Sequence, residues 1–106
     1  MSTLSTHVLD TSLGKPAVGI RVTLMRGELT VGEGTTDADG RARNLIERLE
    51  PGDYRLRFDV EPYFRQSGRE ALYRVISVDF VVFAGNHHYH VPLLLSPFGY
   101  STYRGS

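Results

Sequence analysis

The four histidines of the sequence lie in two places: His7 near the start, and His87, His88 and His90 in one late run. Histidine is the side chain whose ordinary pKa, about 6.5, suits proton transfer near neutral pH. In a β-strand, residues i and i+2 lie on the same face, so His88 and His90 would project together while Tyr89 points to the opposite side. This pattern predicts a pair of imidazoles available for acid–base chemistry, but it fits a solvated polar face equally well.

A zinc site is the alternative for the same histidines. A His-x-His pair on one strand, joined by His7, would supply three imidazole ligands if the first and last strands were neighbours. The run of residues 87–90 contains no carboxylate or thiol, and the sequence has no Cys. We therefore expect no metal at this site, and zinc stays an alternative that a chelator would test.

Two further features could serve a ligand. Arg41 directly follows residues 37–40, Asp-Ala-Asp-Gly, whose types favour a tight turn. An arginine there usually faces solvent, but its fixed fork of donors can also hold an anionic or carbonyl-rich planar ligand. Residues 100–106 carry Tyr100 and Tyr103 at strand-like spacing. Chain ends usually fray, whereas these aromatic side chains favour a docked tail.

Apolar and polar residues alternate with period two along much of the chain, which is typical of β-strands. We therefore expect the candidate residues to lie on strands or on the turns between them. The alternation is clear from Val18 to Leu24, and turn-forming residues separate the segments. The predicted strands cover residues 18–25, 54–58 and 75–82, with weaker ones at residues 2–9, 29–35 and 42–46 and a further one at residues 88–95.

One segment departs from this alternation and suits a short helix. Asp59 is a suitable N-cap for a helix that ends near Gln66, with Pro62 in its first turn and Gly68 after its last. The predicted fold is therefore all-β, with two packed antiparallel sheets and one short helix.

Length and composition limit the function classes. The 106 residues are enough for one domain, residues 1–106, and 12 Lys and Arg balance 12 Asp and Glu. This balance lacks the clustered basic excess of a nucleic-acid-binding protein. No apolar stretch reaches the roughly 18 residues of a membrane-spanning helix, and the start lacks the basic and apolar regions of a signal peptide. We therefore expect a cytoplasmic protein that binds neither nucleic acid nor membrane.

Several stretches together resemble one family. They are Ser5-Thr-His-Val-Leu9, Thr36-Asp-Ala-Asp-Gly-Arg41, and His88-Tyr-His-Val-Pro-Leu-Leu-Leu-Ser96 followed by Tyr100-Ser-Thr-Tyr-Arg-Gly-Ser106. They are similar to the 5-hydroxyisourate hydrolases, the transthyretin-related enzymes of purine breakdown. The terminal Tyr-Arg-Gly-Ser distinguishes these hydrolases from the hormone-carrying transthyretins. The resemblance covers essentially the whole chain.

The resemblance implies a transthyretin-like β-sandwich of two four-stranded antiparallel sheets with one short helix. It also implies a homotetramer whose active sites lie at the dimer–dimer interface, in a channel through the assembly. The implied reaction belongs to urate degradation. It is the hydrolytic opening of the six-membered ring of 5-hydroxyisourate to 2-oxo-4-hydroxy-4-carboxy-5-ureidoimidazoline, with no metal or organic cofactor.

The residues that the resemblance makes catalytic are His7, Arg41, His90 and Ser106. We expect His90 to activate water, His7 to orient the water or protonate the leaving nitrogen, and Arg41 to hold the carbonyl oxygens of the substrate. Ser106 would relay a proton or position the water. Which imidazole is the base and which the acid stays open. The predicted substrate-binding residues are His7, Arg41, His88 and Tyr103.

Three other functions remain as alternatives: a non-catalytic small-ligand carrier of transthyretin type, a zinc hydrolase, and an interaction module without a ligand. A carrier of an apolar ligand has no use for His7, Arg41 and the polar tail in one pocket. A chelator would separate the zinc hydrolase from the cofactor-free enzyme.

Overall fold

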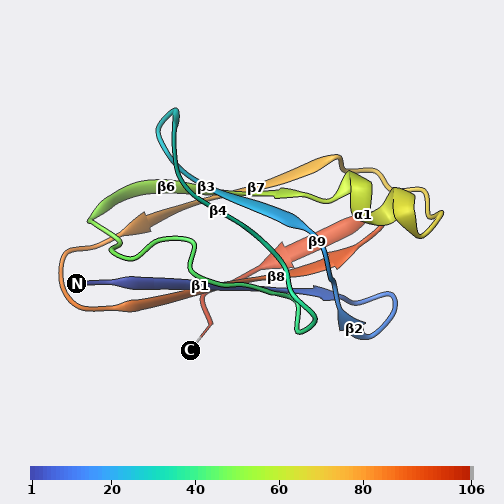
Figure 1. Ribbon diagram of the computed structural model, residues 1–106, viewed down its shortest axis with the longest axis horizontal. Helices are drawn as coiled ribbons and strands as arrows, with labels where there is room; N and C mark the ends of the chain where they lie inside the picture. Colours follow the sequence, from blue (N-terminus) through green and yellow to red (C-terminus); the bar gives the residue numbers. More distant parts are fainter. Residues whose placement is uncertain (106) are drawn as a thin grey trace.

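The computed structural model describes residues 1–105, which form two β-sheets packed face to face with one helix at one end (Figure 1). The elements in chain order are β1 (Thr3–Asp10), β2 (Lys15–Pro16), β3 (Arg21–Arg26), β4 (Leu29–Thr35), β5 (Arg41–Ala42), β6 (Gly52–Asp59), α1 (Glu61–Gln66), β7 (Val75–Val82), β8 (His88–Ser96) and β9 (Gly99–Thr102). One sheet has the order β2-β1-β8-β9, with β5 also paired to β1, and the other has the order β4-β3-β6-β7. The predicted two sheets and one short helix are confirmed.

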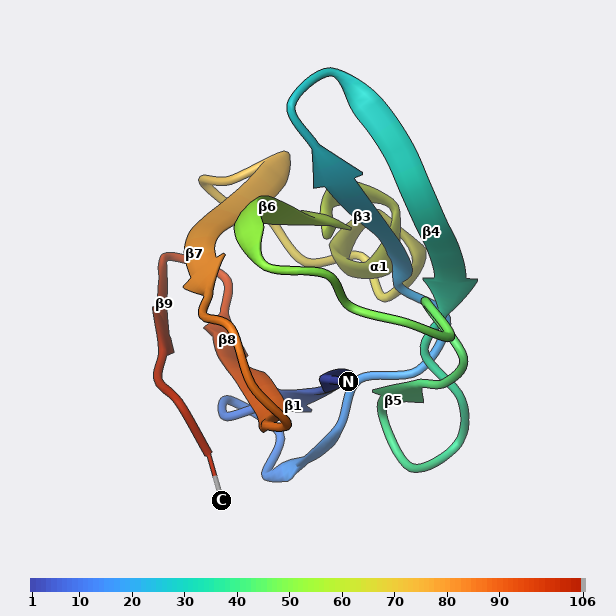
Figure 2. The same cartoon turned by 90° about the vertical axis from the view of Figure 1, so that its left-hand side faces the viewer.

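The pairing of β1 with β8 differs from the prediction of purely antiparallel sheets. These two strands run parallel, whereas the other strand pairs within residues 1–105 are antiparallel. Parallel neighbours need a long crossover connection, and here the chain builds the whole second sheet between them. Figure 2 shows the two layers end-on, with β7 and β9 along the same side of the sandwich. The parallel pair therefore joins the start of the chain to its last third.

The core between the sheets determines which side chains point outward. Alternate residues of the long strands are buried, as the period-two pattern predicts, and burying one large apolar side chain contributes about 1.5–3 kcal/mol. A shift of one residue in the pairing of β1 or β8 would turn these side chains into solvent. Fully buried side chains from both sheets are Val8, Val22, Leu24, Leu56, Phe58, Leu93 and Leu95.

Two predicted strand boundaries are wrong. The strand expected at residues 42–46 ends at Ala42, because Asn44 has a positive φ of 59° and the chain turns Leu45 into the core. The strand expected from residue 18 begins only at Arg21, since Gly19 adopts a φ of 85° in the preceding turn. Local alternation gave no sign of either turn.

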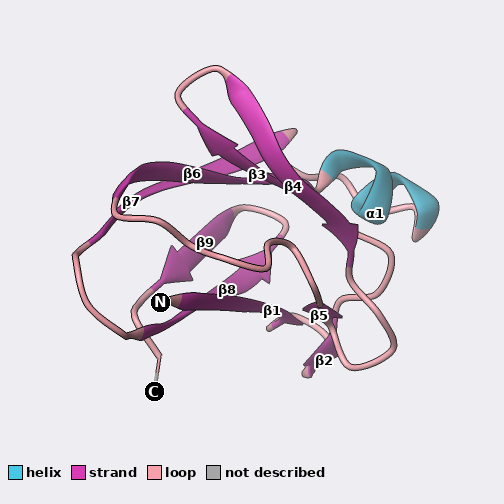
Figure 3. Cartoon of the chain, turned by 60° about the vertical axis from the view of Figure 1, so that its left-hand side comes forward, coloured by secondary structure: helices cyan, strands magenta, loops and turns pink. Residues whose placement is uncertain are grey.

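The helix is shorter than predicted, and its cap is a different residue. Asp59 ends β6, and Val60 is the N-cap without a side-chain hydrogen bond. The free N–H groups of the first turn are served instead by Arg74, whose carbonyl accepts from Val60 and Glu61 at 3.2 and 3.1 Å. Gly68 follows the last turn, as predicted. At six residues α1 is short, and no helix within residues 1–105 has the length and apolarity to cross a membrane (Figure 3).

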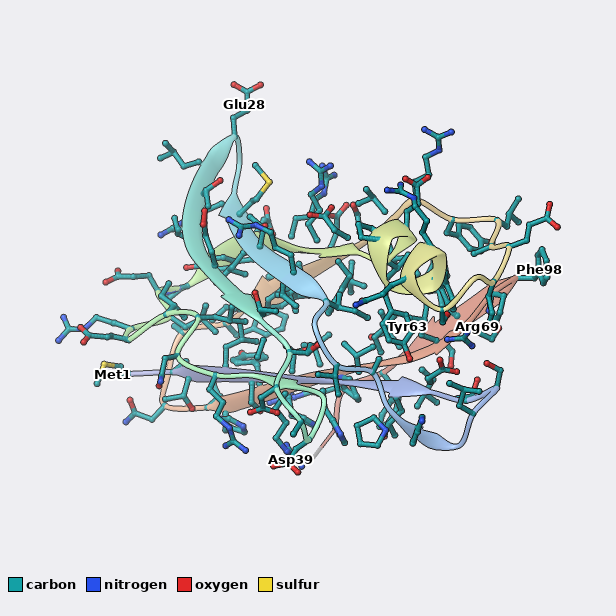
Figure 4. All side chains as sticks on the ribbon, turned by 45° about the vertical axis from the view of Figure 1, so that its right-hand side comes forward. Met1, Glu28, Asp39, Tyr63, Arg69 and Phe98 are labelled. Atoms are coloured by element: carbon teal, nitrogen blue, oxygen red, sulfur yellow. The ribbon has the colours of Figure 1, made fainter. Side chains whose placement is uncertain are left out.

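A buried carboxylate fastens α1 to the end of β1. Asp10 is fully buried, and its Oδ2 accepts hydrogen bonds from the Tyr63 hydroxyl at 2.7 Å and from Arg69 Nη2 at 2.8 Å. Ser12 Oγ donates to the other oxygen at 2.6 Å. Burial alone would raise the pKa of Asp10, but these hydrogen bonds and the Arg69 charge lower it well below its ordinary value. Figure 4 shows Tyr63 and Arg69 together between α1 and the lower sheet.

Candidate active site

The outer face of the β1–β8 pair carries a row of polar side chains. The parallel register places Thr3 beside His88 and Ser5 beside His90. The intervening residues of both strands are more deeply buried, so this set projects away from the core. His7 lies two residues after Ser5 and shares its face. Proximity in three dimensions thus brings together histidines that are more than 80 positions apart in the sequence.

Hydrogen bonds connect this row. Ser5 Oγ lies 2.7 Å from His90 Nδ1 and 2.9 Å from His88 Nε2, so one hydroxyl bridges both imidazoles. Thr3 Oγ1 lies 2.6 Å from His88 Nδ1. Both ring nitrogens of His88 are therefore engaged, whereas His90 is held only through Nδ1 among these contacts.

A tight turn brings Arg41 beside His7. The two residues are paired between β5 and β1, and the Asp37 carboxylate closes the turn by accepting from the Arg41 N–H at 3.0 Å. The turn fits against β1 because Gly40 has no side chain. Its φ is 77°, an added Cβ would lie 2.5 Å from the Val8 carbonyl oxygen, and the Val8 N–H donates to the Gly40 carbonyl at 2.8 Å. The turn in the sequence therefore aims Arg41 at the histidine cluster.

His90 is held toward its neutral form. Its pKa is lowered from the ordinary value of 6.5, first by burial and then by the positive charges of Arg41, His7 and His88. A neutral imidazole has the free lone pair that a general base needs. Crowding by like charges in a partly buried setting is typical of catalytic groups.

The C-terminal segment reaches the same histidine. The Gly105 N–H donates to the His90 carbonyl at 2.7 Å, and a Cβ on Gly105 would lie 2.4 Å from His90 Cδ2. Arg104 points to the other side, with its guanidinium 4.7 Å from the centre of the Tyr89 ring. Tyr103 is 56% exposed and lines a hollow of about 320 Å³ between the edges of β7 and β9. The tail is thus docked, as predicted, but through Arg104 and the Gly105 backbone and not through the exposed Tyr103 side chain.

The geometry of the histidines bears on the zinc alternative. Within residues 1–105, no group of three or more His, Asp or Glu side chains is arranged to hold a metal ion. His88, one of the three ligands of the zinc alternative, has both nitrogens within hydrogen-bond distance of hydroxyls. The histidines are arranged for a hydrogen-bond network, and the expectation of no metal stays a prediction for experiment.

A family model matches residues 4–105, which is nearly the whole chain, and its description is HIUase/Transthyretin family. The chain belongs to this family. The same match covers His7, Arg41 and His90 together with the sheets that position them.

Relatives within the HIUase/Transthyretin family share the full length of the chain. The 5-hydroxyisourate hydrolase of Caulobacter vibrioides is 50% identical, with 100% of both chains covered. The solved structure of Klebsiella pneumoniae 5-hydroxyisourate hydrolase superposes with a TM-score of 0.93 at 42% identity, covering 100% of this chain and 94% of that one. Transthyretin from Sparus aurata superposes almost as well, with a TM-score of 0.91, but at 32% identity, covering 96% and 95%. The fold is thus common to both named groups, and sequence identity favours the hydrolases.

The structure brings together most of the predicted site. His7, Arg41, His88 and His90 lie on one sheet face, and the backbone of residue 105 joins them. Tyr103 instead lines the hollow between the sheet edges, so its predicted contact with substrate stays a prediction. Ser106 lies outside the described residues, and its predicted role stays a prediction too.

Three functional candidates were missed by the sequence analysis: Thr3, Ser5 and Gly105. The first two share the i, i+2, i+4 spacing that ends at His7, which would have placed them on its face. Their contacts with the late histidines follow from the parallel pairing, which no local pattern reveals.

Proposed function

We propose that this protein is a 5-hydroxyisourate hydrolase of urate degradation, which opens the six-membered ring to give 2-oxo-4-hydroxy-4-carboxy-5-ureidoimidazoline. The observation that carries this function is the full-length, 50% identical relationship to the hydrolase of Caulobacter vibrioides. The site supports it independently, because ring opening by water needs a base, an oxyanion donor and an acid. His90, Arg41 and His7 supply these three kinds of group on one face.

His90 acts as the base in this mechanism. Its lowered pKa favours the neutral imidazole. The hydrogen bond between Ser5 Oγ and His90 Nδ1 leaves Nε2 to take a proton from the attacking water. Arg41 holds carbonyl oxygens of the substrate and stabilises the negative charge that develops there. His7 orients the water or protonates the departing ring nitrogen. A positioned general base of this kind contributes about 10²–10⁴-fold to the rate.

The remaining predicted residues complete the site. His88 and Tyr103 contribute to substrate binding, and the terminal Ser106 relays a proton or positions the water with its hydroxyl or carboxylate. The docking of Gly105 onto His90 supports this role, because it holds the C-terminal end of the described chain against the imidazole. No metal or organic cofactor takes part.

The active state is a homotetramer with its sites at the dimer–dimer interface. An outward sheet face cannot exclude water by itself, and a second copy laid over it would do so. Large apolar side chains also remain uncovered in one chain, which is the pattern expected of subunit contacts. Examples with at least half of their surface exposed are Val18, Phe83, Phe98 and Tyr103.

Residues 1–106 work as one domain, and we place the protein in the cytoplasm. The complete absence of Cys is compatible with a reducing compartment. The small-ligand carrier is disfavoured, because its apolar cargo would leave the charged Arg41 and the imidazoles without partners.

The decisive experiment generates 5-hydroxyisourate in place with urate oxidase and follows its near-ultraviolet decay with and without this protein. Decay without the protein is the control, because the substrate breaks down unaided. We expect strong acceleration that survives dialysis against a chelator. No acceleration would reject the hydrolase, and a loss restored by zinc would favour the zinc alternative.

A further inference from the structure

The hydroxyls of β1 and the imidazoles of β8 form one unbroken row. It runs from Thr3 Oγ1 to His88 Nδ1 (2.6 Å), from His88 Nε2 to Ser5 Oγ (2.9 Å), and from Ser5 Oγ to His90 Nδ1 (2.7 Å). We infer that this row is a proton relay, in which Ser5 is a positioning residue that sets the tautomer of His90 and passes its proton to His88. The relay rests on the proposed hydrolase function and deepens it.

The relay has a direction because a serine hydroxyl has a single proton. When Ser5 donates to His88 Nε2, its oxygen is free to accept from His90 Nδ1–H, and His90 Nε2 then carries the lone pair of a base. When Ser5 donates to His90 Nδ1 instead, the proton of His90 sits on Nε2, and the ring can give this proton up as Ser5 delivers another to Nδ1. The two polarities of one hydroxyl thus correspond to the two states that a hydrolase needs from this imidazole.

The His90 ring is also held on its opposite edge. Cδ2 packs against the Gly105 backbone so closely that an added Cβ would be 2.4 Å away. With Nδ1 at Ser5 and Cδ2 at Gly105, the ring cannot rotate without losing one of these contacts. Nε2 is therefore the nitrogen left for the reaction.

Electrostatics explain why a relay is useful here. The positive charge of Arg41 faces His90 from β5, and a proton on His7 of β1 adds a second positive charge, so a charge left on His90 is opposed from two neighbouring strands. His88 lies one step farther along the row from Arg41 and His7, because its partner on β1 is Thr3 and that of His90 is Ser5. Moving the charge from His90 to His88 therefore takes it away from these two neighbours.

The proton steps balance. As water attacks, its O–H bond breaks and a new N–H bond forms at His90 Nε2. The Nδ1 proton then moves to Ser5 Oγ while the Ser5 hydroxyl proton moves to His88 Nε2, which leaves His90 neutral and His88 positively charged. When His90 Nε2–H is given to the leaving nitrogen, the proton on His88 returns through Ser5 to His90 Nδ1. The cycle ends with every group in its starting state.

The first test compares three serine variants. Ser5→Ala removes the bridge, Ser5→Thr keeps a hydroxyl in a residue suited to a strand, and Ser77→Ala is the matched control on the exposed face of the other sheet. General acid–base groups contribute about 10²–10⁴-fold, and we expect Ser5→Ala to lower kcat by about tenfold or more with KM changed less than about twofold. Ser5→Thr should recover most of the rate, and Ser77→Ala should match the unsubstituted protein.

Nitrogen NMR of the His90 ring provides a measurement that does not depend on activity. The unsubstituted protein should show the Nδ1–H tautomer, and Ser5→Ala should lose this preference, because no partner then fixes the proton. An unchanged tautomer, or a Ser5→Ala enzyme with unchanged kcat, would overturn the relay. So would a Ser5→Thr enzyme as slow as Ser5→Ala, because only side-chain shape would then matter.

The far end of the relay is tested by His88→Gln, which keeps hydrogen-bonding groups but cannot accept the proton. We expect a loss of kcat that rising concentrations of imidazole buffer repair, since a diffusing base can replace a lost proton acceptor. A loss that no buffer repairs would remove His88 from the proton path. If the unsubstituted protein does not accelerate decay of 5-hydroxyisourate at all, the proposed function fails, and the NMR comparison still decides the tautomer.

Discussion

Strand β1 carries two polar clusters, and they differ in how charge is treated. Near its end, Asp10 points inward and is fully buried, and Tyr63, Ser12 and the Arg69 guanidinium surround its carboxylate with donors. Three residues earlier, His7 points outward. Its partner on the neighbouring strand β5 is Arg41, which is also a basic residue. Strand β1 thus contributes to one buried ion pair of opposite charges and to one outward cluster of basic residues.

The pKa directions follow from this difference. Donors and a guanidinium favour the charged form of Asp10, so the carboxylate stays ionised and structural. Burial, and after it the positive charges of neighbouring groups, lower the pKa of His90, which favours the neutral imidazole that can accept a proton. Charge compensation therefore accompanies the cluster that holds α1 to β1, and its absence accompanies the cluster that we propose does the chemistry.

The largest expected effect is on catalysis at His90. His90→Asn keeps a group that can bond Ser5 but removes the base, so we expect kcat to fall by about 10²–10⁴-fold. The free energy of unfolding should change by less than about 1 kcal/mol, because the ring lies outside the core. Steady-state rates and urea unfolding measure the two quantities. An active His90→Asn enzyme would contradict the assignment of the base.

The Asp10 cluster should give the opposite result. In Asp10→Asn the amide can no longer compensate Arg69, and breaking a buried pair on one side costs about 3–5 kcal/mol of unfolding free energy. The rate per folded molecule should change little. Asp79→Asn is the matched control, since its partner Arg55 is also an arginine but both side chains are more than half exposed. We expect no resolvable change in its urea midpoint. Equal destabilisation by the two variants would show that burial of the Asp10 pair is not what matters.

The pH dependence of this stability has a definite sign. The pKa of Asp10 is lower in the folded state than its ordinary value of 3.8, so the folded protein binds fewer protons in acid than the unfolded chain. The stabilisation is fully present above that ordinary value and is lost as the pH falls toward the folded-state pKa. Unfolding midpoints of the unsubstituted protein should therefore drop in acid, and those of Asp10→Asn should drop less.

The sequence predicted the two sheets and most of the residues of the candidate site. The contacts that it did not predict have one cause in common. Alternation placed His88 and His90 on one face, and turn-forming residues pointed to Arg41, because those signals are local. Ser5 contacts His88 and His90 across 83 and 85 positions, through a parallel pairing that depends on the whole intervening sheet. Leu45 was likewise assigned to a strand, although its burial in the core bends the chain there. Contacts between residues far apart in the sequence therefore determine these positions, and local sequence patterns do not encode them.

The docked tail offers a smaller and more local test of the active cluster. Gly105→Ala would bring a Cβ within 2.4 Å of His90 Cδ2, so the imidazole or the tail must move. Gly99→Ala is the matched control, because its Cβ would meet only Ser96 Oγ at an ordinary 3.7 Å. We expect kcat to fall about tenfold for the first, from misplacement of the base, and to stay within about twofold for the second. Thermal midpoints should be similar, and equal kcat values would show that the tail does not position His90.

The smallest expected effect is the shift of one titration, which isolates the contribution of like charges to the active cluster. Arg41→Met removes a positive neighbour of His90, so the pKa of His90 should rise toward its ordinary value of 6.5, whereas Arg41→Lys keeps the charge and should leave it lower. NMR titration of the ring measures this directly, even though both variants lose rate. The pKa of His90 is lower in the folded protein than in the unfolded chain, so the free energy of unfolding rises with pH between these two pKa values. Arg41→Met should bring the two pKa values closer together and so narrow the pH range of this rise. A His90 titration that is the same in all three proteins would mean that burial alone lowers its pKa, and the contrast with Asp10 would then rest on solvation and not on neighbouring charge.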